Sequence, residues 1–423
     1  MDFGLAAKHQ MGHHWFRMTT IRNPLPKVAR IDFLEGLRGF LAIYVMFAHI
    51  GYFVGLSVLS PEDHKTYFPG IVPWLLNYFD LSGWDAVNMF MALSGFVIFH
   101  LLNKGHETYL PYITRRFFRL WPVFMLCIVA GVFLNQYFID ILAQNPWSHN
   151  SWVLNQLKVT TAIQSNRLPY FLLDLPMLHG AVPKHLLMDA SSAFSSLAWC
   201  ISTEWQFYLC AAIFFRMFRS LGGTLALTAF AMFSYSAYSV YGDVLFLQWA
   251  NPNASVLPLQ LHWFFLGMIT YQVWRGIEAD GFNGKNRLKF ALVFAFGVWM
   301  AVLKPRLIPG ILGWLVVFMV LVDSVTTKKN PFARFVKGVF NNPVSRYFGR
   351  LSYPVYLLHW PVSILLLKGL VVWYPQSSWS EAYLILIVGV PLLTWLLAHL
   401  THHYLEKPGM EFGKRLAARF SRP

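Results

Sequence analysis

Long apolar segments recur throughout this 423-residue chain and limit what it can fold into. About 20 mostly apolar residues are enough to cross the hydrocarbon core of a bilayer as a helix. Ten such segments are predicted, at about 33–55, 84–103, 117–140, 199–217, 222–241, 257–275, 290–304, 309–325, 351–370 and 382–403. Charged residues make up only 13% of the chain, against about a quarter in a soluble domain. The sequence therefore predicts an all-α protein, a polytopic bundle of about ten transmembrane helices.

The formal net charge of +15 raises the question of nucleic-acid binding, but the basic residues gather on one side of the predicted bundle. When the connections are assigned to alternate sides, all but seven of the 34 Lys and Arg residues lie on the side of the two termini. Those on the other side are Lys65, Lys158, Arg167, Lys184, Lys304, Arg306 and Lys368. Cytoplasmic loops of membrane proteins are enriched in Lys and Arg, so both termini are predicted to be cytoplasmic. The charge reflects topology, and no nucleic-acid partner is expected.

The same pattern divides the chain into a central domain and two tails. Residues 1–30 and 409–423 are basic and are predicted to be cytoplasmic tails, while residues 31–408 form one transmembrane domain. The one long outer connection, at about 141–198, is broken by Pro and polar residues and is expected to cover the outer mouth as short helices. The histidines of the N-terminal tail are interpreted as part of a disordered segment, so no metal site is predicted.

Two ionisable residues stand in the first apolar segment, whose sequence is RIDFLEGLRGFLAIYVMFAHIGY. Ionisable side chains in a membrane span are costly and usually functional. Arg38 and His49 lie eleven positions apart, about three helical turns, so both face one side of the span. The rise between them is about 16 Å, half of a ~30 Å core. Arg38 is predicted near the cytoplasmic surface and His49 beyond the midplane, where an imidazole can act as a general base. The alternative is a histidine that only bonds to a neighbouring helix.

The segment YITRRFFRLWP carries Arg115, Arg116 and Arg119 just before the third span. Guanidinium groups and the amides of a helix N-terminus both favour phosphate, so the cluster is a candidate anion site. The alternative is ordinary flanking charge. Asp32 and Glu35 precede the first span at capping-box spacing, and a capping role is the preferred interpretation for both.

Six short motifs follow one another along residues 30–408. They are DFLEGLRG followed by His49, NMFMALSGFVI, RRFFRLWP, AWCISTEWQFYL, FGRLSYPVYLLHWPV and HYLEKP. In this order they resemble the signatures of the acyltransferase-3 family, membrane proteins that O-acylate carbohydrates and some other acceptors. Three positions depart from the family pattern: Asn88 replaces a frequent Asp, Trp205 replaces a second Glu, and Cys200 replaces a Ser. No carboxylate role is therefore expected at positions 88 and 205.

The resemblance implies acetyl-CoA, or a close acyl-CoA, as the cytoplasmic donor and a carbohydrate hydroxyl as the acceptor. Arg115, Arg116 and Arg119, together with Arg38, are expected to hold the phosphates of coenzyme A. The pantetheine arm would then bring the thioester to His49. That histidine would remove the hydroxyl proton as a general base, or first take the acyl group itself.

The remaining assignments concern partners of this chemistry. Glu204 stands at the acidic position of the family motif and is expected to orient His49, since catalytic histidines usually have such a partner. His359 and Glu35 are assigned to substrate binding, with a buried structural histidine the alternative at position 359. The family places the protein in the bacterial inner membrane, acting on exopolysaccharide, lipopolysaccharide or a related glycan.

A second function, from a different class, is a transporter or flippase of glycans or lipid-linked sugars. Ten spans with buried His, Arg and Glu suit such a protein, but the sequence shows no repeated pair of Gly- or Pro-broken spans. A receptor or scaffold leaves His49 and Glu204 without a role. The particular acceptor, the acyl length and the oligomeric state are left open by the sequence.

Overall fold

The computed structural model describes residues 31–53, 83–104, 108–144, 151–245, 255–327 and 329–420. This part of the chain is all-helical, which confirms the predicted fold class, and each of the ten predicted segments coincides with one helix. The ten are α2 (Phe33–Phe53), α5 (Trp84–Lys104), α6 (Tyr109–Gln144), α9 (Ala198–Met217), α10 (Leu221–Leu245), α11 (Leu257–Asp280), α12 (Gly284–Leu303), α13 (Ile308–Val325), α15 (Pro343–Trp373) and α16 (Trp379–Thr401). The predicted N-terminal tail, 1–30, and the end of the first predicted span, 54–55, lie outside the described residues.

Seven of the described helical segments are long and apolar enough to cross a membrane. They comprise α2, α5, α6, α12, α13, α15 and the rod that runs from α16 to the C-terminal helix α17 (Lys407–Phe420). The other three predicted spans, α9, α10 and α11, are helices but do not meet this criterion. Most side chains of α11 and half of those of α9 are buried against other helices. These two helices therefore present little surface to lipid and tolerate more polar sequence.

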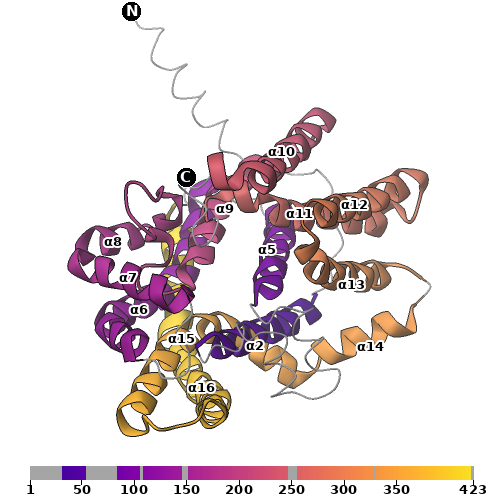
Figure 1. The fold of residues 1–423 in the computed structure, drawn as a ribbon. Coiled ribbons are helices and arrows are strands. Elements are labelled where there is room, and N and C mark those ends of the chain that lie inside the picture. The colour runs from indigo at the N-terminus through magenta and orange to yellow at the C-terminus, as the bar shows by residue number, and fades with distance from the viewer. Residues whose placement is uncertain are drawn as a thin grey trace, which may run out of the picture.

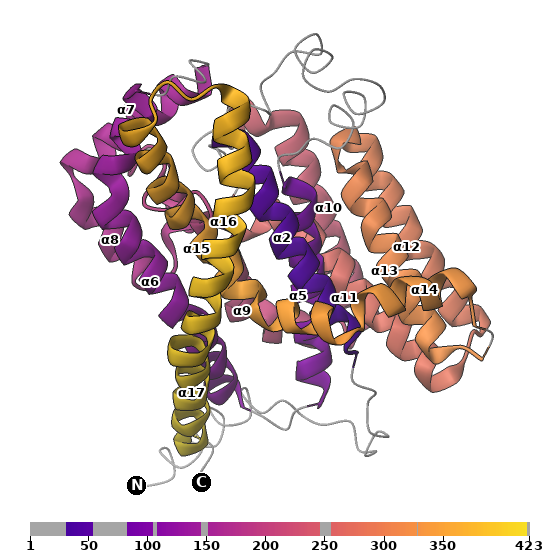
Figure 2. The same cartoon turned by 90° about the horizontal axis from the view of Figure 1, so that it is seen from below.

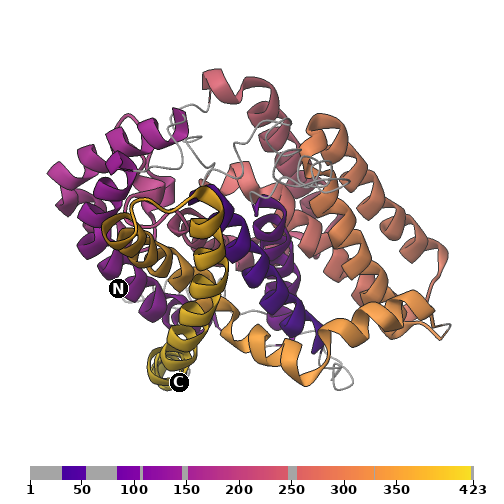
Figure 3. The same ribbon diagram turned by 60° about the horizontal axis from the view of Figure 1, so that its bottom comes forward.

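Helices α2, α5 and α15 form the centre of the bundle. Helix α15 packs against α2, α6 and α16, while α5 packs against α2, α9, α11 and α13. In Figures 1 and 3, α2 and α5 lie between a group containing α6, α7 and α8 and a second group containing α10 to α13. Figure 2 shows that α17 prolongs α16 at one end of the bundle, whereas α7 lies at the opposite end.

Two close helix crossings depend on glycine. A Cβ at Gly39 of α2 would lie 2.6 Å from the backbone nitrogen of Gly349 in α15. A Cβ at Gly95 of α5 would lie 2.2 Å from the carbonyl oxygen of Phe264 in α11. Neither distance leaves room for a side chain, so these helices meet backbone to backbone, as small residues allow in membrane bundles. The crossings bring the polar side chains that flank them, Arg38 and Ser94, into the interior.

The segment predicted as an outer connection, 141–198, consists largely of short helical pieces. It holds the end of α6, then α7 (Ser151–Ser165), α8 (Arg167–Asp174) and two 3₁₀ turns, η2 (His179–Ala181) and η3 (Ala190–Ser192). A buried contact of 2.8 Å between Asp174 Oδ1 and His179 Nδ1 ties α8 to η2. Nε2 of His179 also lies 3.0 Å from the carbonyl oxygen of Ala198, which anchors the connection to the start of α9. Burial raises the pKa of Asp174, and the neighbouring histidine partly offsets that shift.

Two regions predicted as connection or tail contain ordered helices. Helix α14 (Pro331–Phe340) lies between α13 and α15 in the chain and packs against α2 and α13. Most of the predicted tail, 409–423, belongs to α17, which packs along α6. The rings of Phe412 and Phe118 meet there edge to face, 4.9 Å apart. A short π-helix, His402–Glu406, joins α16 to α17.

Candidate active site

His49 and His359 lie side by side inside the bundle, although they are 310 positions apart in the chain. Nδ1 of His49 lies 3.3 Å from Nε2 of His359, and the ring centroids are 5.2 Å apart. The pair forms because α2 and α15, which carry these residues, pack along each other. His359 is fully buried, whereas His49 retains partial exposure. Of the two rings, that of His49 is thus the more accessible to a reacting group.

Backbone carbonyls fix the orientation of both rings. Nδ1 of His49 lies 2.9 Å from the carbonyl oxygen of Val45, and Nδ1 of His359 lies 3.1 Å from that of Val355. A carbonyl oxygen only accepts, so each Nδ1 carries the hydrogen and each Nε2 keeps the lone pair. Nε2 of His359 can then accept from Nδ1–H of His49. This assignment leaves the basic lone pair of His49 on Nε2, the tautomer that a general base requires.

Glu204, on α9, belongs to a separate polar cluster. Its Oε1 accepts a hydrogen bond from the Ser94 hydroxyl at 2.7 Å and another from the Tyr208 hydroxyl. Among the described residues these two hydroxyls are its hydrogen-bond donors, so the structure does not bring Glu204 into hydrogen-bond contact with His49. A side chain that does contact the imidazole of His49 is that of His359.

The four arginines singled out in the sequence are linked to this carboxylate by electrostatic interactions, directly or through one another. The charges of Arg38 and Arg116 both act on Glu204, and Arg119 acts on both arginines. Arg115 lies further out and interacts with Arg116. Nε of Arg116 is buried and has no hydrogen-bond partner among the described residues. Cationic groups therefore outnumber carboxylates in this cluster, which favours an anionic ligand.

A cavity of about 510 Å³, the basic vestibule, lies among the ends of α2, α5, α6 and α15 and the start of α17. Its ionisable lining residues are Arg38, Arg119, Arg350, Lys407, Glu35, Glu406, His100 and His402. The His402 and Glu406 side chains form a buried pair, with 2.6 Å between Nδ1 and Oε2, across the π-helix. Short π-helices often mark functional positions. Glu35, predicted to bind substrate, lines the vestibule and is not part of the histidine site.

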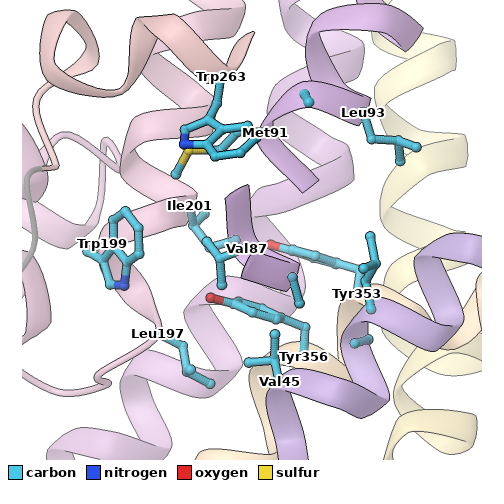
Figure 4. Close-up of a cluster of buried hydrophobic side chains, with 14 of the residues drawn as sticks. Val45, Val87, Met91, Leu93, Leu197, Trp199, Ile201, Trp263, Tyr353 and Tyr356 are labelled. Atoms are coloured by element: carbon cyan, nitrogen blue, oxygen red, sulfur yellow. The ribbon is translucent and has the colours of Figure 1, made fainter. Parts of the chain in front are cut away.

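A second, narrower space, the central pocket, adjoins the basic vestibule. The two share Arg38, Ser352 and Tyr353 as lining residues, and the central pocket continues to Glu204 and Tyr356. Its volume is about 40 Å³. Figure 4 shows the hydroxyl groups of Tyr353 and Tyr356 pointing the same way, toward Val87 and Ile201, which also line this pocket.

Tyr356, which lines the central pocket, lies beside His359 on α15. The ring centroid of Tyr356 lies 6.1 Å from that of His359, and its hydroxyl lies 2.8 Å from Sγ of Cys200. A line of polar groups therefore runs from the basic vestibule, past Arg38 and Glu204, to Tyr356 and the two histidines.

Tyr353 and Tyr356 of this line are not among the residues singled out from the sequence. Tyr353, Tyr356 and His359 recur every three residues in YPVYLLH, within an otherwise apolar span. Residues three apart lie on neighbouring positions of one helix face. That spacing could have indicated one polar stripe on α15. Arg350, at the same three-residue interval, extends the stripe into the basic vestibule.

The fold and the site together define a multi-pass integral membrane protein with polar cavities inside its helix bundle. The family model for the acyltransferase-3 domain (Acyl_transf_3) matches residues 31–399, and the chain belongs to that family. The resemblance read from the motifs is thereby confirmed. Membership implies transfer of an acyl group from a donor to an acceptor. No match was found among curated proteins or among solved structures.

Proposed function

We propose that this protein transfers an acyl group, acetyl by family habit, from cytoplasmic acyl-CoA to a hydroxyl of an extracytoplasmic or lipid-linked glycan. The observation that carries the proposal is the line of polar groups between the basic vestibule and the His49–His359 pair. It offers an anionic, elongated donor a route from a cationic cavity to an imidazole. Exopolysaccharide and lipopolysaccharide are acceptors of the proposed kind.

The basic vestibule supplies the donor site of this proposal. Coenzyme A carries phosphates at one end and a thioester at the end of a long, thin arm. Arg119, Arg350 and Lys407 line the wide cavity, where charge-assisted hydrogen bonds to phosphate are strong. Arg115 and Arg116 add positive charge beside it. Arg38 lines both the large vestibule and the small central pocket, so the arm of coenzyme A would pass it on the way toward Glu204 and Tyr356.

Transfer then requires one proton to move. Nε2 of His49 accepts the proton of the acceptor hydroxyl, and the oxygen forms a bond to the thioester carbonyl carbon. The carbon–sulfur bond breaks, the thiolate leaves, and the proton on His49 passes to it. The products are an ester and free coenzyme A. His359 holds the imidazole of His49 in the required tautomer and disperses its transient positive charge.

A second route uses the same groups. Nε2 of His49 attacks the thioester carbonyl carbon, the carbon–sulfur bond breaks, and coenzyme A leaves as a thiolate. The acceptor oxygen then forms a bond to the acyl carbon, the carbon–nitrogen bond to the imidazole breaks, and the hydroxyl proton passes to the thiolate. His359 can receive the Nδ1 proton of His49 while the acyl-imidazole exists. Mass spectrometry of protein quenched during turnover distinguishes the two routes, since only the second leaves an acyl group on the peptide containing His49.

The predicted topology fits this arrangement. The vestibule lies at the end of the bundle where α17 begins, on the side that the positive-inside rule assigns to the cytoplasm. Glu204 acts here as a positioning residue: it balances Arg38 and Arg116 while Ser94 and Tyr208 hold it in place. Both termini are cytoplasmic in this scheme, and the membrane is the bacterial inner membrane.

The rival function, a glycan flippase, makes a different prediction about acyl-CoA. Protein purified into nanodiscs is supplied with acetyl-CoA and a panel of neutral and acidic saccharides, and free coenzyme A thiol is measured. The proposal predicts release that falls by about 10²- to 10⁴-fold in His49→Ala, the usual contribution of a general base. His403→Ala, at an exposed histidine in the π-helix, is the matched control and retains activity. A flippase consumes no acyl-CoA, so absence of thiol release from the folded wild type refutes the proposal.

A further inference from the structure

A pocket on the far side of the histidine pair shares no lining residue with the basic vestibule or the central pocket. It lies between α6, α7, α15 and the loop that precedes α9, and we call it the Asp189 pocket. Its polar and aromatic lining includes Asn135, Gln156, Thr160, Asp189, Ser195 and Trp360. In Figure 2, α7 lies at the end of the bundle away from α17, so this pocket and the basic vestibule belong to different ends.

Asp189 is the unusual member of this lining. The residue is only 7% exposed, and its Oδ1 is buried without a hydrogen-bond partner among the described residues. Its backbone is left-handed, with φ of 50°, a conformation uncommon outside glycine. Lys184 acts on its charge at a distance, and burial raises the pKa of the Asp189 carboxyl. A buried acceptor without a donor is costly, so a ligand that donates a hydrogen bond there would stabilise the site.

The other lining groups indicate what kind of donor fits. Asn135 and Thr160 are each 4% exposed, and Nδ2 of Asn135 donates to Gln164 at 2.7 Å. Among the described lining residues no Lys or Arg occurs, in contrast to the basic vestibule. A phosphate or a carboxylate would meet the Asp189 carboxylate with no cationic side chain in the described pocket lining. The pocket therefore suits an uncharged molecule rich in hydroxyl groups.

The size of the space defines how much of such a molecule enters. The volume is about 30 Å³, and a single water needs at least about 10–15 Å³ by the same kind of measure. One or two hydroxyl groups on the edge of a sugar ring fit, while the remainder of the glycan stays outside. A pocket of this size contacts only the hydroxyl groups on one edge of a sugar ring, so it distinguishes acceptors by the arrangement of those hydroxyls.

Trp360 connects this pocket to the reaction site. Its side chain lines the pocket, and its ring meets His49 edge to face with centroids 6.0 Å apart. It also directly follows His359 on α15. An acceptor seated against Asp189 is thus separated from the catalytic imidazole by one aromatic side chain.

We infer that the Asp189 pocket is the acceptor subsite, in which Asp189 accepts a hydrogen bond from a hydroxyl of an uncharged sugar and Trp360 guides that sugar toward His49. The inference rests on the proposed acyltransferase function. It adds the class of acceptor, an uncharged sugar residue, and the residue that recognises it.

The test separates acceptor binding from donor binding. Nanodisc protein is assayed with labelled acetyl-CoA and three uncharged probes, the methyl glycosides of glucose, galactose and mannose, and with glucuronic acid as the anionic probe. Asp189→Asn is expected to raise the KM of an accepted glycoside at least tenfold and to leave the KM of acetyl-CoA within twofold. Asp140→Asn is the matched control, because Asp140 pairs with Lys368 at 2.8 Å and does not line the pocket.

Each result bears on one proposal or the other. An unchanged glycoside KM in Asp189→Asn overturns the inference, as does a wild type that acetylates glucuronic acid but none of the glycosides. Equal rises in both KM values also overturn it, because they indicate a general structural defect. If the wild type neither releases coenzyme A thiol nor binds acetyl-CoA, the proposed function itself fails. Comparing thermal unfolding of both variants with the wild type shows that each is folded.

Discussion

The basic vestibule and the Asp189 pocket differ in charge and in size, and they lie at different ends of the bundle although α6 and α15 contribute to both. The vestibule measures about 510 Å³ and has four cationic side chains in its lining, whereas the pocket measures about 30 Å³ and has one carboxylate. The first suits a large anion and the second the hydroxyl edge of an uncharged molecule. In the proposed mechanism both substrates reach the pair of His49 and His359. Under this proposal, the donor and the acceptor occupy separate cavities at opposite ends of the bundle and do not compete for one site.

The strongest way to break this scheme is to disturb the histidine pair that the two cavities share. His359→Leu removes one of the two acceptors beside Nδ1–H of His49 and leaves the Val45 carbonyl, and it is expected to lower kcat by about 100-fold, within the range for an acid–base partner. His359→Gln retains an acceptor near the position of Nε2 and should recover much of that loss. Acetyl-CoA KM should stay within twofold in both variants. Equal losses of kcat in His359→Leu and His359→Gln would show that His359 contributes only packing.

A charge reversal in the basic vestibule sharpens the comparison from the donor side. Arg119→Glu should raise the KM of acetyl-CoA by about 10- to 100-fold, since a charge-assisted hydrogen bond contributes about 1.5–3 kcal/mol. The acceptor KM should not change. Raising the salt concentration should weaken donor binding more in the wild type than in the variant. Arg415→Glu, at an exposed position of α17 outside the vestibule lining, is the control. Equal rises in the KM of acetyl-CoA and in the KM of the acceptor would mean that the arginines set the membrane topology and do not bind the donor.

A smaller effect is expected where the vestibule narrows into the central pocket. Glu204→Gln leaves Arg38 and Arg116 without their balancing carboxylate and is expected to lower kcat about tenfold. Ser94→Ala removes one hydrogen bond to that carboxylate, worth about 1 kcal/mol, and should lower kcat about fivefold. A steady-state assay with saturating acetyl-CoA measures both. If Ser94→Ala cost more than Glu204→Gln, the hydroxyl and not the carboxylate would be the important group.

The smallest effect concerns stability at the Asp189 pocket. Because burial raises the pKa of Asp189, the folded state binds more protons than the unfolded state, and this residue's contribution to stability falls as the pH rises above the ordinary value of about 3.9. Asp189→Asn should therefore unfold at a higher temperature than the wild type at neutral pH. The difference should shrink as the pH falls toward 4. A destabilised variant at pH 7 would mean that the carboxylate is satisfied in the folded protein.

The transmembrane helices were predictable because length and apolarity alone define them. All ten segments became helices, and Arg38 and His49 could be placed on one face from helical periodicity. The sequence missed α14 and α17, which are amphipathic and too polar to resemble spans. Phe412 of α17 packs on Phe118 of α6, a contact between segments almost 300 positions apart that no local pattern reveals.

The site was only partly predictable for the same physical reason. The arginines and His49 stand out because charge is rare in an apolar span. Their partners depend on tertiary packing: His359 meets His49 because α2 and α15 cross at glycines, and Glu204 meets Ser94 because α5 packs against α9. Asp189 lies in a loop, where a carboxylate is ordinary, and only its burial without a partner distinguishes it.

Transfer across the membrane is the central claim, and the side on which each substrate is supplied tests it most directly. Protein is reconstituted into proteoliposomes, and the fraction with the vestibule facing inward is determined by protease access to α17. Acetyl-CoA is sealed inside, and a glycoside that the nanodisc assay has identified as an acceptor is supplied outside. Acetylated glycoside is expected in the outer medium, in proportion to that fraction, with coenzyme A retained inside. Product that forms only when both substrates share one compartment would contradict the account.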